Sequence, residues 1–324
     1  MQVCTETVRQ LTSEFCANII KAEHGGGIMR VKGVAVDDTY AEGFHMSGTR
    51  FLVTADTMDW ALEAGRKATG FATSIIACGC EADIESTFSS GPDGRPGVSV
   101  ILMGMNHQLV AEQTLTRVGQ CVMTCPTTAC YNGWQGGEPI DVGKSLRYFG
   151  DGFQTSKQIF GKRFWRIPVM DGEFLCEERF GSFEQGSDSN LILFGEDRAA
   201  TLRAAQAAVT AMRKSGGVIL PFPGGIVRSG SKVGSKYKKL HASTYHRCCP
   251  TLKSEADTLI PEGANCVYEL VLCGANEEDI RRAMAAGIHA AALPGVILIS
   301  AGNYGGNLGK VKYPLYEILA GEAL

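Results

Sequence analysis

One local pattern recurs four times after residue 50 and constrains the fold more than any other feature of the chain. In each copy a short β-rich run is followed by a residue that caps or begins a helix, then by a helical run, and then by a glycine. The expected strands are 50–54, 98–103, 190–194 and 267–272, and the expected closing glycines are Gly70, Gly119, Gly216 and Gly295. Asp56, Asn106 and Asn276 are the expected caps, and the third helix is expected to begin at Asp197. A further β-rich segment follows each helix, at 71–78, 121–125, 218–221 and 296–300. The pattern predicts four strand–helix–strand units.

The four units divide into two halves. Residues 102–106 (LMGMN) and 272–276 (LCGAN) match at the same place in the second and fourth units. Two βαβ-like units per half are the signature of a split βαβ sandwich. We therefore predict an α+β fold of two duplicated ferredoxin-like lobes, over residues 29–152 and 153–324, with a hairpin at 163–180 between them. Residues 1–28 are expected to form a disordered extension outside the fold.

Charge and composition exclude several classes of protein. The chain has 31 Lys and Arg against 34 Asp and Glu, too balanced for a general nucleic-acid binder. No apolar run reaches the roughly 18 residues that a membrane helix needs, so we expect no membrane span. Its 12 cysteines contain no C-x-x-C pair, which favours reduced thiols in the cytoplasm. Its six histidines show no ligand spacing such as H-E-x-x-H, so we expect no metal site.

A glycine-rich basic loop is expected at 221–236 (PFPGGIVRSGSKVGSK). Residues 225–232 approach the spacing of a phosphate-binding P-loop, but that loop needs Lys directly after the glycine, and here Ser231 precedes Lys232. Glycine amides together with Ser231, Lys232 and Lys236 still form a suitable cradle for an anion. A solvated basic loop without a ligand explains the composition equally well.

Glu269 interrupts an otherwise apolar strand, VYELV at 267–271. A carboxyl group that is buried there would have a raised pKa, because desolvation disfavours its charged form. Such a neutral acid can donate a proton to a developing oxyanion or to a leaving nitrogen. On the other reading Glu269 faces solvent or an ion partner on the outer side of the sheet, and the residues alone favour that reading slightly.

Two further segments carry candidate polar contacts. Residues 119–128 (GQCVMTCPTT) begin where a helix is expected to end, and their thiols have no nearby His in the sequence to activate them. Buried structural thiols are therefore favoured there over a nucleophile. Residues 149–154 (FGDGFQ) form either a ligand-binding turn around Asp151 or only a turn.

Taken together, these segments resemble one known family, the formylmethanofuran:tetrahydromethanopterin formyltransferases. Eight ordered motifs carry the resemblance and span about residues 31–319: 36–44 (VDDTYAEGF), 68–74 (ATGFATS), 92–98 (PDGRPGV), 118–124 (VGQCVMT), 149–152 (FGDG), 221–227 (PFPGGIV), 231–236 (SKVGSK) and 299–306 (ISAGNYGG). Residues 77–82 (ACGCEA) are more similar to the bacterial, formaldehyde-oxidising branch than to the methanogenic one.

The resemblance implies a cytoplasmic enzyme of one-carbon metabolism that assembles as a homotetramer. It would transfer a formyl group reversibly between the amine of a methanofuran-type coenzyme and N5 of tetrahydromethanopterin. Both coenzymes are substrates, and no permanently bound cofactor or metal is implied. In the bacterial branch the enzyme is similar to one of the subunits of a formyltransferase/hydrolase complex, so the other subunits of such a complex are possible partners.

The resemblance also assigns roles to residues. The family's catalytic glutamate falls on Glu269, and the anionic tails of the coenzymes make Ser231, Lys232 and Lys236 expected substrate contacts. Gln120, Thr124 and Asp151 are weaker candidates for contacts with the pterin or the formyl group.

Two departures from the family pattern leave alternatives open. Tyr245-His246 stands where the family has Asn-Asp, and residues 187–189 (SDS) replace a glycine triplet. Bulkier residues at former glycines restrict how closely a ligand approaches the backbone. The main alternative is therefore an inactive or altered paralogue that acts as a structural subunit of the complex. A nucleotide-binding protein that uses the loop at 225–232 is a more distant alternative.

Overall fold

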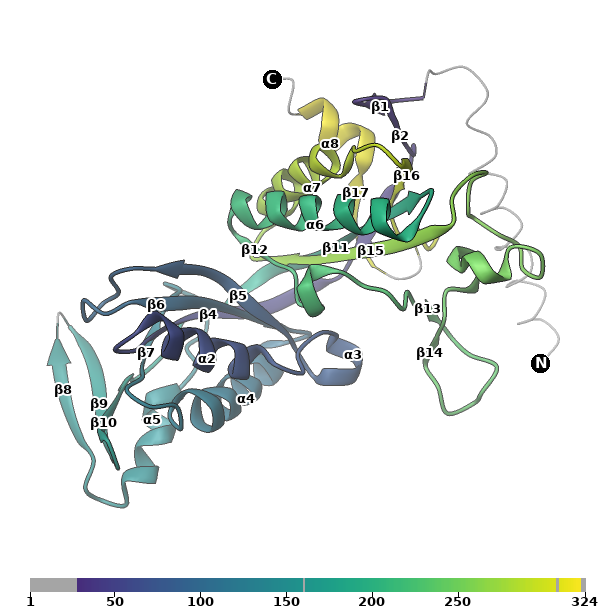
Figure 1. Cartoon of the computed structure of the whole chain (residues 1–324). Helices are drawn as coiled ribbons and strands as arrows, with labels where there is room; N and C mark the ends of the chain where they lie inside the picture. The colour runs from purple at the N-terminus through teal and green to yellow at the C-terminus, as the bar shows by residue number, and fades with distance from the viewer. Residues whose placement is uncertain (1–27, 160, 307–308, 322–324) are drawn as a thin grey trace.

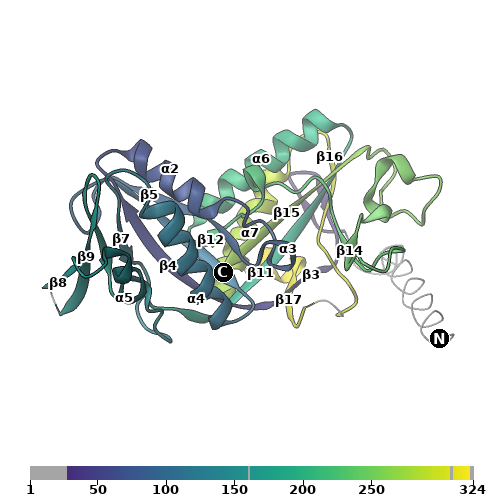
Figure 2. The same cartoon turned by 90° about the horizontal axis from the view of Figure 1, so that it is seen from below.

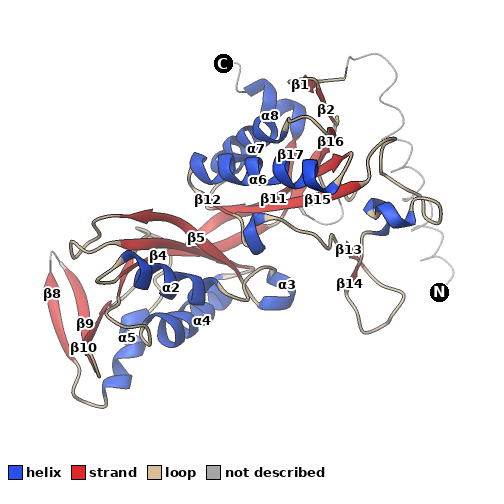
Figure 3. Ribbon diagram, viewed as in Figure 1, coloured by secondary structure: helices blue, strands red, loops and turns tan. Residues whose placement is uncertain are grey.

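The computed structural model describes residues 28–159, 161–306 and 309–321, arranged as two lobes (Figure 1). The expected extension, apart from residue 28, lies outside the described residues. Each lobe packs helices against strands, and Figure 3 shows the strands running on from one lobe into the other. The predicted α+β class is confirmed, with a large mixed sheet of 13 strands in the described part of the chain.

The first lobe contains the first two predicted units. Its elements are β4 (His45–Thr54), α2 (Met58–Thr69), β5 (Glu81–Phe88), β6 (Gly97–Gly104), α4 (His107–Arg117) and β7 (Ala129–Asn132). The strands lie in the order β7-β4-β6-β5, and all neighbours are antiparallel. Phe51 and Val53 of β4 pack with buried alanines of α2, including Ala61 and Ala64, in the core of this lobe.

Three strands extend the sheet of the first lobe beyond β7. They are β8 (Thr155–Ile159), β9 (Lys162–Val169) and β10 (Gly172–Glu177), and they follow the short helical segments α5 (Val142–Leu146) and η3 (Arg147–Gly150). β9 and β10 form the predicted hairpin. Because β10 pairs in parallel with β7, the sheet of the first lobe continues past residue 152, where the sequence placed the boundary between lobes.

The second lobe repeats the arrangement of the first. Its elements are β11 (Phe183–Gly195), α6 (Arg198–Ser215), β12 (Val218–Ile219), β15 (Cys266–Gly274), α7 (Glu277–Ala291) and β16 (Val296–Ser300). The strands lie in the order β12-β15-β11-β16 with antiparallel neighbours. Residues before the first lobe add β1 (Arg30–Val31) and β2 (Val34–Val36) beside β16. Next, β3 (Tyr40–Gly43) pairs with β17 (Val311–Pro314) in a separate small sheet, and α8 (Leu315–Gly321) follows β17.

The two lobes are joined through β11. Its first residues pair with the beginning of β4, and its second half pairs with β15 and β16. A small apolar core lies at the junction, where Met46, Met103 and Phe183 pack with Ile219 and Cys273. Figure 2 shows from below how β4 and β11 run from one lobe toward the other.

Two of the three predicted helix caps, Asn106 and Asn276, are confirmed, and Asp197 caps the helix that was expected to begin with it. The side chains of Asn106, Asp197 and Asn276 each accept a hydrogen bond from a backbone N–H of the first helical turn. In the first unit Thr57 caps the helix in place of Asp56.

Two of the expected strands are wrong. Residues 71–78 instead contain the short helix α3 (Ile75–Cys78), which ends at Gly79 in a left-handed conformation, and the strand begins only at Glu81. At 121–125 the chain continues past Gly119 as a π-helical turn, η2 (Val118–Val122), and the strand follows as β7. Val118 and Val122 are both buried in the core of the first lobe. Short apolar runs do not distinguish a strand from a buried helical turn.

Candidate active site

The candidate site lies on the face of the second lobe's sheet that the helices leave open. Leu270 and Leu272 of β15 are buried in the core that α6 and α7 form with the sheet. Successive side chains of a strand point to opposite faces, so Glu269 and Cys273 point to the open face. Asn190, on the neighbouring strand β11, shares that face through the register of the two strands. The sheet pairing thus brings polar groups together on the face opposite the core that α6 and α7 cover.

Glu269 is partly buried and has one fixed side-chain partner. The Nδ2 atom of Asn190 donates a hydrogen bond of 2.8 Å to Oε1 of Glu269. Burial raises the pKa of Glu269 above its ordinary value, and the hydrogen bond from Asn190 opposes part of that shift. Each reading of Glu269 is partly right: the residue lies on the open face of the sheet, as the second reading has it, but it is partly buried and its side-chain partner is the amide of Asn190 and not a cation. A carboxyl of this kind can hold a proton and transfer it.

The glycine-rich loop comes to Glu269 through its backbone. After the turn η4 (Pro223–Gly225), where Gly224 and Gly225 both have positive φ, Val227 pairs with Glu269. The N–H of Val227 donates to the carbonyl of Glu269 over 2.7 Å, and the reverse bond measures 3.1 Å. Pairing with the part of β15 that β12 leaves unpaired therefore places the start of the basic loop beside the carboxyl group.

A cavity of about 330 Å³ lies between Glu269, the basic loop and the segment around residues 245–251. Burial and the nearby Glu269 raise the pKa of the Cys248 thiol to about 12, so it is protonated at neutral pH. The residues lining the cavity are Ile192, Val227, Arg228, Ser229, Gly230, Tyr245, Cys248, Cys249, Pro250, Thr251, Val267 and Glu269.

Two tyrosines stand close to this carboxyl. The rings of Tyr245 and Tyr304 lie 6.2 Å apart and are tilted by 34°. Burial, and then the charge of Glu269, raise the pKa of Tyr304. Its backbone N–H donates over 2.6 Å to Oε1 of the buried Glu42, which also accepts from the N–H of Gly306 over 2.7 Å. Glu42 thereby holds the 302–306 turn against the site.

The predicted anion contacts lie on a hairpin next to the cavity. β13 (Lys232–Val233) pairs with β14 (Ala242–Ser243), and the helical turns η5 (His246–Cys248) and η6 (Pro250–Leu252) follow. Ser231 and Lys236 are exposed and Lys232 is partly exposed. Burial and the positive charges of Lys232, Arg247 and Lys236 lower the pKa of His246. The hairpin is therefore a positively charged neighbour of the Glu269 cavity, suited to anionic groups.

The other three predicted contacts lie in the first lobe. Gln120 and Thr124 line a largely apolar groove of about 770 Å³ together with Met123, Phe149 and Met170. Asp151 follows Phe149 on an exposed turn and has a left-handed backbone conformation. This groove shares no lining residue with the Glu269 cavity. Within one chain Ser231, Lys232 and Lys236 lie on the hairpin that adjoins the Glu269 cavity and do not line it, and Gln120 and Thr124 lie in a different cavity.

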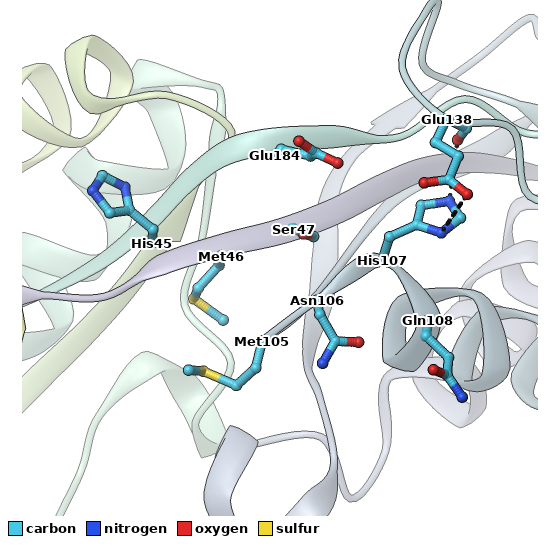
Figure 4. A pocket seen from close by; sticks show the side chains of 9 residues that line it. All are labelled: His45, Met46, Ser47, Met105, Asn106, His107, Gln108, Glu138 and Glu184. Carbon is cyan, nitrogen blue, oxygen red and sulfur yellow. Dashed lines mark hydrogen bonds and ion pairs between the residues drawn. The ribbon is translucent and has the colours of Figure 1, made fainter.

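A third cavity, of about 600 Å³, lies near the lobe junction and includes two histidines (Figure 4). His107 contacts Glu138, with Nδ1 and Oε1 separated by 3.5 Å, while His45 lies at the opposite side of the view. No group of three His, Cys, Asp or Glu side chains in the described ranges is placed to hold a metal ion. Nor does any described helix have the length and apolarity to cross a bilayer.

Each of the two departures from the family pattern places a residue on the open face of the second lobe's sheet or at its cavity. Tyr245 lines the Glu269 cavity. Asp188 lies on β11, and its Oδ1 accepts a hydrogen bond of 2.5 Å from the N–H of Phe44. Burial and the neighbouring Glu81 raise the pKa of Asp188 to about 7.

The sequence alone assigned no role to Asn190, Tyr304 or Glu42. The structure places Asn190 and Tyr304 next to Glu269. Glu42 lies behind them and supports the turn that carries Tyr304. Tyr304 and Glu42 do lie within two of the eight motifs, which was the available signal. Asn190 offered a weaker signal, because it is a polar residue at the start of an apolar run. Its role depends on a residue of another strand and was not visible locally.

Comparison with known proteins identifies the family to which the whole fold corresponds. A family model described as formylmethanofuran-tetrahydromethanopterin formyltransferase matches residues 29–169, and a model for the proximal lobe matches residues 172–318. A relative named as this enzyme in Methylococcus capsulatus is 52% identical, with 90% of this chain and all of the relative covered. A second relative, named as one of the subunits of the formyltransferase/hydrolase complex of Methylorubrum extorquens, is 46% identical, and the match covers 89% of this chain and 97% of the relative.

Two solved structures match along nearly the same span. One is the formyltransferase/hydrolase complex of Methylorubrum extorquens with methylofuran, in which the matching chain is 44% identical with a TM-score of 0.88, covering 90% of this chain and 99% of that one. The other is the formyltransferase of Methanosarcina barkeri, 47% identical with a TM-score of 0.85, covering 90% and 100%.

Proposed function

The chain belongs to the formylmethanofuran:tetrahydromethanopterin formyltransferase family, and on this basis we propose that Glu269 is the catalytic acid of its reaction. The protein is a formyltransferase that transfers a formyl group between a formylmethanofuran-type coenzyme and tetrahydromethanopterin. The observation that supports the role of Glu269 is its position: a desolvated carboxyl with a raised pKa, lining a cavity beside a basic hairpin.

The chemistry requires a proton donor at this place. N5 of the pterin attacks the formyl carbon of the furan coenzyme, and a tetrahedral intermediate forms. As the bond between that carbon and the furan amine breaks, the leaving nitrogen must gain a proton. Glu269 donates it, and the proton that N5 loses restores the acid. The reverse reaction uses the same groups in the opposite order, so the transfer is reversible. No covalent enzyme intermediate is needed.

The hairpin supports a proposal about substrate binding. Both coenzymes carry anionic groups, and we place these on Ser231, Lys232 and Lys236, next to the cavity. Gln120, Thr124 and Asp151 are proposed to contact the pterin or the formyl group. Because Gln120 and Thr124 line a separate groove within one chain, they would meet the substrate at Glu269 of a neighbouring copy, which accords with the proposed homotetramer.

The arrangement of strands supports a proposal about the architecture. Each lobe has the element order strand–helix–strand–strand–helix–strand, and the four strands lie in the order 4-1-3-2 in both. We infer two duplicated ferredoxin-like lobes and propose 29–152 and 153–324 as their main units, with β8–β10 joining the sheet of the first lobe and β1 and β2 joining that of the second. We further propose a cytoplasmic location, a part in formaldehyde oxidation, no permanently bound cofactor, and association with other subunits of a formyltransferase/hydrolase complex, as in the Methylorubrum relative.

A direct assay tests the catalytic role. Purified protein is mixed with formylmethanofuran and tetrahydromethanopterin, and the formylated pterin is followed by its ultraviolet absorbance. We expect turnover, and a loss of about 10²–10⁴-fold in kcat in folded Glu269→Gln, the range for removal of a general acid. Glu262→Gln makes the same chemical change at an exposed site and should leave kcat unchanged.

Two outcomes contradict the proposal in different ways. Full activity in Glu269→Gln would show that another group supplies the proton. Absence of turnover in the folded wild-type protein, with and without its partner subunits, would favour the structural paralogue.

A further inference from the structure

We infer that Asn190 is a positioning residue that distinguishes the two oxygens of Glu269, with Oε1 held as an acceptor and Oε2 carrying the proton that is transferred. The inference rests on the proposed role of Glu269. It identifies the residue, on a different strand, that donates a hydrogen bond to Glu269. It also identifies the oxygen of Glu269 from which the proton is transferred. Asn190 is 8% exposed and lies on β11, and its Nδ2 atom is 2.8 Å from Oε1 of Glu269.

The orientation of the Asn190 amide is determined by its other contact. Its Oδ1 atom accepts a hydrogen bond of 2.7 Å from the backbone N–H of Gly302. Rotating the amide by 180° would place two N–H donors against the N–H of Gly302, so the NH₂ group must face Glu269. A side chain at Gly302 would collide with this amide, so the close approach requires glycine.

A fixed donor on Oε1 decides where the proton of Glu269 sits. If Oε1 carried the proton, its O–H would face the NH₂ group of Asn190, which accepts no hydrogen bond in this geometry. Protonated Glu269 therefore carries its hydrogen on Oε2 and keeps Oε1 as the acceptor. The proton is then on the oxygen that Asn190 does not contact and is available to a substrate.

The support behind Asn190 is itself buried. The carbonyl of Gly302 accepts from the N–H of Glu42 over 3.1 Å, and the carboxylate of Glu42 holds the N–H of Tyr304 over 2.6 Å. A continuous series of hydrogen bonds thus runs from Glu42 through the Gly302 turn and Asn190 to Glu269. Such a series keeps the amide in one position before substrate arrives.

Several other groups also face Glu269 and contribute to its titration. Asp188 on β11, Cys248 in η5 and Tyr304 in the 302–306 turn interact with its charge, and Arg228 and Tyr245 line the same cavity. Asn190 is the group that donates to the carboxylate in the described structure. Its removal should therefore change the pH dependence in one direction, toward a more tightly held proton.

The test is Asn190→Asp, which keeps an acceptor for Gly302 and replaces the donor to Oε1 by a second carboxyl oxygen. The two carboxyls then share one proton on the Oε1 side. We expect kcat to fall at least tenfold and the alkaline limb of the kcat–pH profile to move up by about one pH unit, while both KM values stay within about threefold. Asn265→Asp, an exposed site outside the cavity, should reproduce the wild-type profile.

A second variant and a second background separate the explanations. Asn190→Leu adds no charge and should move the limb in the same direction, so it decides the matter if Asn190→Asp fails to fold. In a Glu269→Gln background, Asn190→Asp should change the residual kcat by less than twofold. The inference is overturned if Asn190→Asp lowers kcat equally in the wild-type and the Glu269→Gln backgrounds, or if the Asn190 variants keep the wild-type pH profile. If Glu269→Gln itself is fully active, the proposed catalyst is wrong instead.

Discussion

At the scale of single residues, the fold removes several carboxyl groups from water. Glu81 of β5 accepts hydrogen bonds from Sγ of Cys273 at 2.8 Å and from the N–H of Ile75 at 3.1 Å, and burial raises its pKa. Burial, together with the nearby charges of Glu81 and Glu269, raises the pKa of Asp188 to about 7. These acids hold their protons more tightly in the folded protein than in the unfolded chain.

Asp188 therefore links stability to pH. Between its ordinary pKa of 3.8 and its folded value of about 7, the folded state binds more protons than the unfolded state. The free energy of unfolding should consequently fall as the pH rises from 5 to 7, and Asp188 should account for up to about 1 kcal/mol per pH unit. In Asp188→Asn this part of the slope should disappear, because an amide does not titrate. Urea unfolding at pH 5, 6, 7 and 8 measures how the free energy of unfolding changes with pH.

The control for this experiment lies on the same strand. Glu184→Gln, at an exposed position of β11, should leave the slope unchanged. A slope in Asp188→Asn equal to that of the wild type would show that other groups carry the pH dependence.

At the scale of elements, helix starts were predictable and two strands were not. A cap depends on a side chain and on backbone groups two or three residues away, so Asn106, Asp197 and Asn276 could be identified locally. The segment 121–125 is apolar because its helical turn packs against the core of the first lobe. In 71–78 the helix α3 has no buried residue, Phe71 and Ile76 are exposed, and Ile75 packs beside the junction core. Local sequence shows that both segments are apolar, but it shows neither their conformation nor how deeply they are buried.

The matched caps of the two lobes provide a test at this scale. In α4 the Oδ1 atom of Asn106 accepts from the N–H of Leu109 at 2.9 Å, and in α7 Asn276 makes the same bond to Asp279. Asn276 also donates from Nδ2 to Oδ2 of Asp279 at 2.8 Å. Asn106→Ala should lower the free energy of unfolding by about 1 kcal/mol, and Asn276→Ala should lower it by more.

Chemical denaturation of the two variants gives the comparison. Asn106→Ser and Asn276→Ser retain an oxygen acceptor at each cap and should recover most of the loss. Equal effects of the two alanine variants would mean that the additional bond to Asp279 contributes nothing.

At the scale of the whole molecule, the decisive feature is the junction of the lobes. β11 is long enough to pair with β4 in one lobe and with β15 in the other, and the apolar residues at the junction come from both. The four repeated units indicated two lobes, but strand pairing over such distances is not encoded in any local pattern. Because the sheet and the junction core are shared, we expect the two lobes to unfold together.

Phe183→Ala tests this coupling. Phe183 is 7% exposed in the junction core, and its ring packs on Trp134 with centroids 4.8 Å apart. Removing it should cost about 3–5 kcal/mol of unfolding free energy. Unfolding followed by far-ultraviolet circular dichroism and by tryptophan fluorescence should still give one coincident transition.

Phe149→Ala removes the same side chain from a position that is 66% exposed and should change stability by less than about 0.5 kcal/mol. Two separate transitions, with only one shifted by Phe183→Ala, would show that the lobes unfold independently.

The amino-acid sequence was enough to predict the alternation of strands and helices, most helix ends, the family, and the position of Glu269 within an apolar strand. These properties depend on neighbouring residues or on ordered motifs. Which face of β15 is covered became known only from the folded chain, because a period of two places alternate residues on opposite faces without saying which face the helices bury. The same holds for the meeting of Glu269 with Asn190, 79 residues away, and with Val227, since contacts of that kind form only when strands pair.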